Sequence, residues 1–532
     1  MNSLTKFVLL TAVGIAGAVA SHMVQAQEPI PAGEVKEGAA LYATHCAACH
    51  NGDRFGGIGP ALLPESIAKL RGEALTTVIA KGRPASQMPA FAGELNEEQI
   101  GQLSAYLRSE PAVQPVWGED EIKATYTLLV DPMSLPNKPV FAGDPLNLFT
   151  VVEAGDHHVT ILDGDKMEPL TRFESRFALH GGAKYSPDGR FVYLASRDGW
   201  VTLYDLYSLQ KVAEVRVGLN TRNVAVSDDG RYVMAGNMLP HSLVVMDAKD
   251  LKPLRIIPVT GDDGASSRVS AVYTAPPRGS FIVALKDMPE VWEIPYSKPK
   301  KPIYPGFVHN YEAGMVEALG VQDRAFALRR IRLEDHLDDF FFDQDYRHLI
   351  GASRDGQSGQ VVNLNVGRKI ADVALDGMPH LGSGITFDWQ DRSVLATPHL
   401  MEGKISVIDM QDWSTIKVLE TMGPGFFMRS HENSPYAWAD VFFGPNRDVV
   451  HIIDKSTLEI VKTLKPEPGK VAAHVEFDRS GRYALLSIWD DEGAVIVYDA
   501  KTLEEIKRLP MSKPVGKYNV YNKITYSAGT SH

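Results

Sequence analysis

From about residue 146 to its end, the chain repeats one hydrophobic pattern. Each copy is a run of about three to five apolar, mostly β-branched residues, which in most copies ends at Asp or Asn and is followed by a polar turn. The copies are residues 159–163, 201–205, 243–247, 291–294, 361–365, 405–409, 450–454 and 495–499. Short apolar runs bounded by turn residues predict buried β-strands.

A second pattern precedes several of these runs and predicts the turns between strands. It occurs at residues 186–191 (SPDGRF), 227–232 (SDDGRY) and 478–483 (DRSGRY). Asp-Gly and Ser-Gly between apolar runs are typical of β-hairpins. The strand runs recur about every 42 to 48 residues, apart from one interval of about 70. That period is typical of a β-propeller, and an extended solenoid is the alternative.

The repeats also predict how the chain is divided. Eight copies predict an all-β, eight-bladed propeller at residues 146–532, and the long interval predicts an insertion around residues 298–332. Prolines crowd the stretch just before the first copy. Because proline favours extended, connecting backbone, this stretch predicts a linker at residues 116–145.

The chain before the linker has helical rather than strand patterning. Residues 35–44, 75–82 and 96–108 are expected to form helices. Asn96 is a plausible N-cap of the last one, because its short polar side chain can accept from a free backbone N–H. Together these segments predict a small all-α domain at residues 27–115.

The helical domain contains the sequence CAACH at residues 46–50, the spacing of a c-type haem attachment site. Cys46 and Cys49 would bind the two vinyl groups, and His50 would ligate the iron. These are the only two cysteines of the chain, so a four-thiolate zinc site is excluded, although a redox dithiol or mixed zinc site remains the alternative. Met88 lies in the loop before the last predicted helix, where small cytochromes c place the sixth ligand. A core or surface methionine is the alternative there, and His45 is a weaker rival ligand.

The N-terminus and the charge indicate a compartment. Residues 1–26 combine Lys6, an apolar stretch too short to span a bilayer comfortably, and a small-residue cleavage site. They predict a cleaved signal peptide, with an uncleaved anchor as the alternative, and haem c attachment agrees with export to the periplasm. Lys and Arg number 54 against 66 Asp and Glu, a net charge of −12. This acidic balance disfavours nucleic acid and anionic membrane surfaces as partners, and no stable membrane insertion is expected.

A haem c domain joined to an eight-bladed propeller resembles the cytochrome cd1 family, and three stretches make the resemblance specific. Residues 177–199, which include FALH, SPDGRF and SRDG, resemble the segment holding the proximal histidine of haem d1, here His180. Residues 378–384 (MPHLGSG) resemble the loop of the distal-face histidine, here His380. Residues 514–522 (PVGKYNVYN) resemble the C-terminal motif of the family.

The resemblance implies one of two activities. One is the reduction of nitrite to nitric oxide, with protons supplied by two distal histidines. The other is the dehydrogenation of dihydro-haem d1, in which a propionate becomes an acrylate at the last step of haem d1 biosynthesis. A non-catalytic haem d1 carrier is a third alternative, but a carrier needs no haem c as an electron exit.

The residues expected at the distal face favour the dehydrogenase. Residues 337–343 (LDDFFFD) resemble the stretch that carries one distal histidine in the reductases, and Asp338 replaces that histidine. His336 lies two positions earlier, which in a regular strand would put it on the same face. By resemblance, His474 occurs where the dehydrogenase is expected to have a base. Removing hydrogen beside a carboxylate requires such a base, and a neutral imidazole suits the task.

The resemblance also implies roles for individual residues. His180 and His380 would approach the iron of the d1 macrocycle from opposite faces, and His474 would accept the proton, with Tyr518 helping to position it. For each histidine, a core or turn residue is the alternative.

Two arginines and several partners complete the implied site. Arg222 and Arg268 would bind substrate carboxylates through forked, charge-assisted hydrogen bonds, with surface salt bridges as the alternative. The expected partners are the tetrapyrrole substrate, a periplasmic electron acceptor such as a c-type cytochrome, and the cytochrome cd1 nitrite reductase that receives haem d1.

Overall fold

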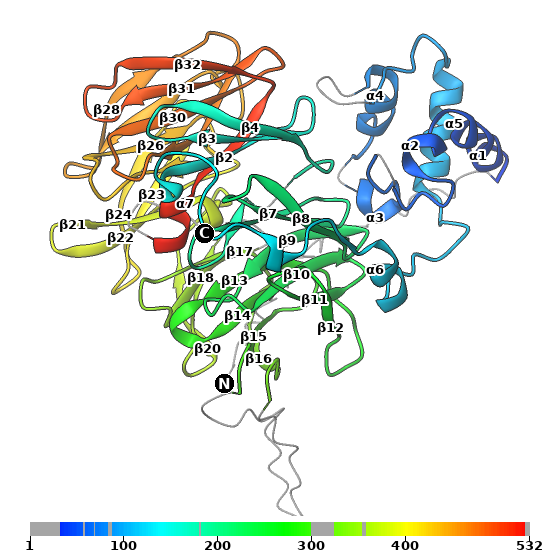
Figure 1. Ribbon diagram of the computed structural model, residues 1–532, viewed down its shortest axis with the longest axis horizontal. Coiled ribbons are helices and arrows are strands. Elements are labelled where there is room, and N and C mark those ends of the chain that lie inside the picture. Colours follow the sequence, from blue (N-terminus) through cyan, green and yellow to red (C-terminus); the bar gives the residue numbers. More distant parts are fainter. Residues whose placement is uncertain are drawn as a thin grey trace, which may run out of the picture.

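The computed structural model describes residues 32–56, 59–68, 70–82, 88–179, 182–298, 324–353 and 358–526. The predicted signal peptide, residues 1–26, lies outside this part. The described chain forms a small helical domain beside a ring of eight β-sheets (Figure 1), so both parts of the predicted fold class are confirmed. No helix among the described residues is long and apolar enough to cross a membrane.

The helical domain is built on two packed helices. Its helices are α1 (Ala32–His45), α2 (Ala47–His50), α3 (Pro64–Ile67), α4 (Ala74–Lys81) and α5 (Glu97–Arg108). α1 packs against α5, whose buried positions Ile100, Leu103 and Leu107 recur at helical spacing. Asn96 is the N-cap that the sequence predicts: its side chain accepts from the Gln99 N–H at 2.9 Å, and the Gln99 side chain accepts from the Asn96 N–H at 3.0 Å.

The propeller blades follow one another along the chain. In each blade the strands are given from the innermost outward. The first blade is β33 (Pro514–Asn519), β2 (Leu148–Glu153), β3 (His158–Asp163) and β4 (Glu168–Glu174), and the second is β5 (Lys184–Tyr185), β6 (Phe191–Ala195), β7 (Trp200–Asp205) and β8 (Gln210–Arg216). The third blade is β9 (Asn220–Val226), β10 (Tyr232–Leu239), β11 (Ser242–Asp247) and β12 (Pro253–Pro258), and the fourth is β13 (Val269–Ala275), β14 (Ser280–Leu285), β15 (Glu290–Pro295) and β16 (Arg329–Arg332). The fifth blade is β17 (Leu337–Phe342), β18 (His348–Ser353), β19 (Gly359–Asn363) and β20 (Arg368–Val373), and the sixth is β21 (Ile385–Trp389), β22 (Arg392–Pro398), β23 (Lys404–Asp409) and β24 (Thr415–Glu420). The seventh blade is β25 (Met428–Arg429), β26 (Tyr436–Asp440), β27 (Val450–Asp454) and β28 (Glu459–Leu464), and the eighth is β29 (Val471–Phe477), β30 (Tyr483–Trp489), β31 (Gly493–Asp499) and β32 (Glu505–Met511).

The two ends of the propeller sequence close the ring. β33, the last strand of the chain, pairs antiparallel with β2, the first strand of the repeats, with Tyr518 opposite Thr150. This pairing makes β33 the innermost strand of the first blade. The short helix α7 (Val520–Thr525) follows directly. Ring closure therefore brings Tyr518 to the central channel, beside strands that precede it by hundreds of residues.

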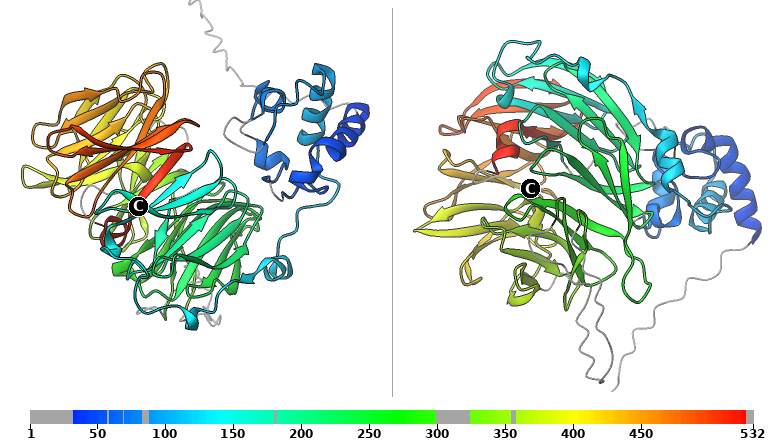
Figure 2. Two further views of the ribbon diagram at one scale, coloured as in Figure 1. Left: turned by 45° about the horizontal axis from the view of Figure 1, so that its top comes forward. Right: turned by 60° about the horizontal axis from the view of Figure 1, so that its bottom comes forward.

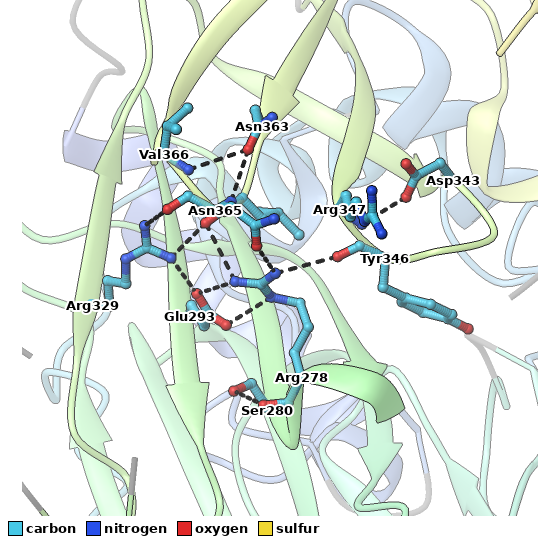
Figure 3. A network of polar contacts seen from close by, with 11 residues as sticks. Arg278, Ser280, Glu293, Arg329, Asp343, Tyr346, Arg347, Asn363, Asn365 and Val366 are labelled. Atoms are coloured by element: carbon cyan, nitrogen blue, oxygen red, sulfur yellow. Dashed lines mark hydrogen bonds and ion pairs between the residues drawn. The ribbon is translucent and has the colours of Figure 1, made fainter. Parts of the chain in front are cut away.

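Every predicted strand run falls on the third strand of a blade, and where the run ends at Asp that residue has a structural role. In β31, for example, Asp499 Oδ1 accepts from the backbone N–H groups of Lys501 and Thr502 at 2.9 and 2.8 Å. Such side-chain acceptance stabilises the turn to the outer strand. In the fifth blade the predicted run 361–365 is displaced, because β19 ends at Asn363. The Asn363 side chain takes the aspartate role there (Figure 3).

A buried polar network joins the fourth and fifth blades near the predicted insertion (Figure 3). Glu293, which is 7% exposed, accepts from Arg278 at 2.8 Å and from Arg329 at 2.6 Å. Both arginines also donate to the turn after β19, at Asn365 and the Leu364 carbonyl. β16 falls inside the predicted insertion 298–332, whose residues 299–323 lie outside the described chain.

The linker differs from the prediction of extended backbone. Glu119–Thr125 form helix α6, and β1 (Thr127–Leu128) pairs with the outer edge of β8. Single-turn helices η1 (Pro132–Ser134) and η2 (Pro145–Asn147) follow. The prolines lie outside α6, which explains how a proline-rich stretch can contain a helix. Figure 2 shows the linker passing from the helical domain to α6 beside the propeller.

Candidate active site

The CAACH residues are arranged as haem c attachment requires. Cys46 lies between α1 and α2, and its carbonyl accepts from the Cys49 and His50 N–H groups at 3.1 and 3.0 Å, which makes a tight helical turn. Neither cysteine forms a disulfide. The His50 imidazole is buried, and Nδ1 donates to the Pro60 carbonyl at 2.7 Å. Nε2 is therefore the nitrogen left for a metal, and burial lowers the pKa of His50, which favours the neutral, ligating form.

The surroundings of His50 and Met88 support the same function. Gly59 lies against the imidazole so closely that a Cβ there would come within 2.5 Å of its Cε1. Met88 is half-buried in the loop between α4 and α5. That loop returns onto α4, where the Phe91 N–H donates to the Ile79 carbonyl at 3.2 Å. The surroundings of His50 fit a haem c, and Met88 lies in the loop that the sequence predicts to supply the second ligand.

The loop after His50 is bound to the propeller by Arg216 at the end of β8. The guanidinium donates to the Phe55 carbonyl and, at 3.4 Å, to the Gly56 carbonyl. It is 5% exposed and lies 4.6 Å from the ring centroid of Trp117 in the linker. A buried, planar donor held between three parts of the chain fixes the haem c loop on the second blade.

A series of neighbouring rings on the inner side of the propeller joins three of the predicted site residues. Neighbouring ring centroids are 4.2 Å apart for His380 and Phe426, 4.6 Å for Phe426 and Phe427, 4.8 Å for Phe427 and His474, and 5.2 Å for His474 and Tyr518. We call these five residues the channel row. They come from the loop before β21, the loop before β25, β29 and β33, so four consecutive blades assemble it.

His474 is held in an unusual backbone conformation. Its φ is +56°, and the pairing of β29 with β30 is shifted between Ala473 and Val475, so His474 is the extra residue of a β-bulge. A left-handed conformation costs a non-glycine residue about 1–2 kcal/mol. The strain turns the side chain out of the strand alternation and into the channel row. Strained bulges of this kind concentrate at functional sites.

The environment of His474 keeps its imidazole neutral. The residue is 2% exposed, and Nδ1 has no hydrogen-bond partner in the part of the chain that the structure describes. Burial, followed by the positive charge of Lys517, lowers the pKa of His474 well below its ordinary value. A neutral imidazole with a free ring nitrogen can accept a proton.

His380 is oriented by a different contact. Nδ1 donates to the Phe426 carbonyl at 2.7 Å, so Nε2 is the nitrogen available to a ligand or metal. The residue stands at the N-cap of η4 (Leu381–Ser383). Burial lowers the pKa of His380 as well. His180 lies outside the described residues, but Gly182, two positions later, touches the Tyr518 ring closely enough that an added Cβ would come within 3.2 Å of it.

The two predicted arginines lie in different surroundings. Arg222, on β9, donates from Nε to the Ser270 carbonyl at 2.7 Å, and its charge lowers the pKa of His380. Arg268 makes a forked ion pair with Asp287 at 2.8 and 2.6 Å and lies 3.9 Å from Glu65 of the helical domain. Arg222 is therefore close enough to His380 to act on its charge, whereas Arg268 stands where the two domains meet.

Sequence reasoning missed further cations that surround the channel. Burial and Arg429 lower the pKa of Lys184 to about 8, and burial and Arg222 lower the pKa of Arg197 to about 9. Arg429 is 3% exposed. Burial is the larger cause of both shifts, and the positive charges of Arg429 and Arg222 add to it. These cations suit a ligand with carboxylates, and Glu476 lies 3.9 Å from Arg429. Lys184 and Arg197 lie within or beside the quoted FALH, SPDGRF and SRDG stretches, but nothing local in the sequence distinguishes Arg429.

His336 lies just before a strand whose beginning is irregular. β17 begins at Leu337, and its pairing with β18 is shifted between Leu337 and Asp339. The alternation that would have placed His336 and Asp338 on one face is therefore broken. Asp338 instead forms an ion pair with Lys286 at 2.9 Å.

The far side of the channel is narrow. Lys184, Tyr273, Lys523 and Tyr526 are among the residues that line a cavity of about 40 Å³, which α7 borders. That is room for a few water molecules and far below the roughly 300 Å³ or more of a typical ligand pocket.

Comparison with known proteins agrees with this architecture. Residues 143–314 and 302–523 match the family described as Cytochrome D1 heme domain, and residues 33–107 match the family described as Cytochrome C oxidase, cbb3-type, subunit III. These matches define a c-type cytochrome domain joined to a haem d1-type propeller. The chain belongs to the cytochrome cd1 family, in the group that contains dihydro-haem d1 dehydrogenase.

Individual relatives support that placement. Dihydro-heme d1 dehydrogenase of Pseudomonas aeruginosa is 56% identical over 93% of this chain and 96% of its own length. Nitrite reductase of Stutzerimonas stutzeri is 26% identical over 94% of this chain and 95% of its own. A solved structure of dihydro-heme d1 dehydrogenase NirN in complex with DHE has a TM-score of 0.83 and 55% identity, covering 92% of this chain and 100% of that one.

Proposed function

We propose that this protein is an oxidoreductase that converts dihydro-haem d1 to haem d1 by desaturating a propionate to an acrylate. The observation that carries the proposal is the channel row, which holds the neutral imidazole of His474 next to Tyr518 and links it to His380 through Phe426 and Phe427. The substrate follows from the 56% identical relative, dihydro-heme d1 dehydrogenase, and the cationic surroundings support a polycarboxylate.

The chemistry requires a base and an electron exit. Desaturation removes two hydrogens from neighbouring carbons of the propionate, that is, two protons and two electrons. His474 accepts one proton at a ring nitrogen, and the second leaves to solvent. Tyr518 helps to hold the reacting side chain beside His474. Burial raises the pKa of Tyr518 to about 12, so it remains a neutral hydrogen-bond donor.

The same proposal assigns the remaining predicted residues. His180 and His380 would face the macrocycle iron from opposite sides, and Arg222 would bind a substrate carboxylate. Arg268, already paired with Asp287, would reach the substrate only through an exchange of partners.

The haem c would be held by Cys46 and Cys49 through thioether bonds and by His50 and Met88 as axial ligands. When bound, it supplies one-electron transfer, so the two electrons leave in successive steps. The Arg216 contacts would fix its loop against the propeller.

Several features favour this reaction over nitrite reduction. Asp338, which is paired with Lys286, occupies the position that corresponds to one distal histidine of the reductases. His336 lies before β17 begins. The reductase relative is also far less similar, at 26% identity.

We further propose a periplasmic location, a c-type cytochrome as electron acceptor, and the cytochrome cd1 nitrite reductase as recipient of the product. Haem c attachment and the predicted signal peptide support the location.

The test adds dihydro-haem d1 anaerobically to the haem c-loaded protein with an oxidised cytochrome c. The expected result is a product two hydrogens lighter by mass spectrometry, with reduction of the protein's haem c in the optical spectrum. His474→Gln should abolish conversion, whereas His451→Gln should not. His451 is a matched control because it is also buried but is bonded at both ring nitrogens, to Thr463 at 2.9 Å and Met422 at 3.2 Å. Unchanged macrocycle with nitrite turnover would refute the proposal.

A further inference from the structure

We propose that Asp440 is a positioning residue that holds His380 and His474 in one fixed relation across the channel row. The inference rests on the proposed function, because it concerns the two histidines assigned to that reaction. Asp440 is the last residue of β26 and contacts the supports of both histidines through its two carboxylate oxygens.

One oxygen holds the loop that orients His380. Asp440 Oδ1 accepts from the Phe426 N–H at 2.8 Å and from the Phe427 N–H at 3.0 Å. The Phe426 carbonyl in turn accepts from His380 Nδ1 at 2.7 Å. The orientation of the His380 imidazole therefore depends on a peptide that Asp440 fixes in place.

The other oxygen holds the bulge that carries His474. Asp440 Oδ2 accepts from the His474 N–H at 3.3 Å. The carbonyl of the same residue accepts from Lys517 Nζ, which also donates to Ser487 Oγ at 2.8 Å. Two buried side chains, Asp440 and Lys517, therefore bind the N–H and the carbonyl of the left-handed His474 residue, and these bonds offset its strain.

The contacts require a carboxylate and no other group of that size. A carboxylate has only acceptors, and here it receives three N–H groups. An asparagine has a single acceptor oxygen, so its NH₂ group would face either the His474 N–H or the N–H groups of Phe426 and Phe427. Asp440 is 3% exposed, and burial raises its pKa to about 6, which leaves it ionised at neutral pH.

The test compares Asp440→Asn with Asp448→Asn in haem c-loaded protein. Asp448 is the matched control because it is a buried carboxylate of the same blade, accepting from the Gly469 N–H at 2.6 Å and from Lys465 at 3.0 Å outside the channel row. We expect Asp440→Asn to lower kcat at least about tenfold with KM changed less than about threefold, since a misplacement of 1 Å can cost about a hundredfold. Asp448→Asn should leave both constants near those of the wild type.

A second readout needs neither substrate nor turnover. In reduced protein labelled with ¹⁵N-histidine, Asp440→Asn should shift the ring signals of both His380 and His474 and speed exchange of the His380 Nδ1 proton, while Asp448→Asn should not. Asp440→Glu keeps the charge and is the variant of choice if Asp440→Asn does not fold; it too should lower kcat and shift both histidines. If a folded Asp440 variant gave the histidine signals of the wild type, the inference would be overturned. Equal losses of kcat in Asp440→Asn and Asp448→Asn would overturn it as well. Absence of turnover in the wild type would refute the proposed function alone, because the histidine signals still decide the role of Asp440.

Discussion

Replacing His474 by glycine should give a protein about as stable as replacing it by alanine, although an alanine-to-glycine change in a buried strand normally destabilises. Both variants remove the imidazole and its contacts with Phe427 and Tyr518, so these losses cancel in the comparison. Alanine keeps the strain of the φ of +56°, about 1–2 kcal/mol, whereas glycine adopts that conformation without it. Glycine loses about 0.5–1 kcal/mol in chain entropy. Glycine also lacks the buried methyl group, worth about 0.8 kcal/mol, so the terms cancel to within about 0.8 kcal/mol and the two variants should be about equally stable.

The control lies in the same strand. Ala472 is fully buried and has ordinary strand geometry, so Ala472→Gly should destabilise the propeller by about 0.5–1 kcal/mol from chain entropy plus about 0.8 kcal/mol for the lost methyl group. Scanning calorimetry of the haem c-loaded variants would detect shifts of roughly 1 °C per kcal/mol for a domain of this size. Hydrogen exchange of the β29 amides measures the same local differences directly. The exchange of alanine for glycine should therefore cost about 1–2 kcal/mol less at position 474 than at position 472. If it cost the same at both positions, the strained bulge would not exist and the placement of His474 would be wrong.

Three further predictions concern other parts of the molecule. Because the pKa of His474 is lowered well below 6.5, kcat should stay constant from pH 8 down to about 6.5 and fall only at lower pH; a fall centred above 6.5 would show a solvated histidine or another base. Arg216→Leu should release the helical domain and increase both the radius of gyration in X-ray scattering and linker proteolysis, whereas Arg231→Leu, at an exposed ion pair, should change neither. Asn96→Ala should destabilise α5 by about 1 kcal/mol in urea unfolding followed at the haem, and Asn96→Ser should restore most of the loss; equal stability of all three proteins would contradict the capping role.

The local features of this protein could be predicted from its sequence. Repeated apolar runs specify strands because burial on both faces requires that composition, and their constant spacing specifies blades. The third strand of every blade, the three principal helices and the Asn96 cap were found in this way. Each depends on residues within a few positions of one another. The errors were also local: the linker contains α6, and the run at 361–365 overshoots β19 by two residues.

The arrangement of the site required the tertiary structure. Ring closure brings Tyr518 beside His474, and the β29 bulge turns His474 into the channel, but neither the pairing of β33 nor the bulge is encoded in a local pattern. Asp440 could not be found for the same reason, because the groups it binds come from separate loops and strands. The sequence by itself therefore determined the elements, the haem c motif and the family resemblance. Which side chains meet in the channel was decided by contacts between blades, whose geometry depends on the whole ring.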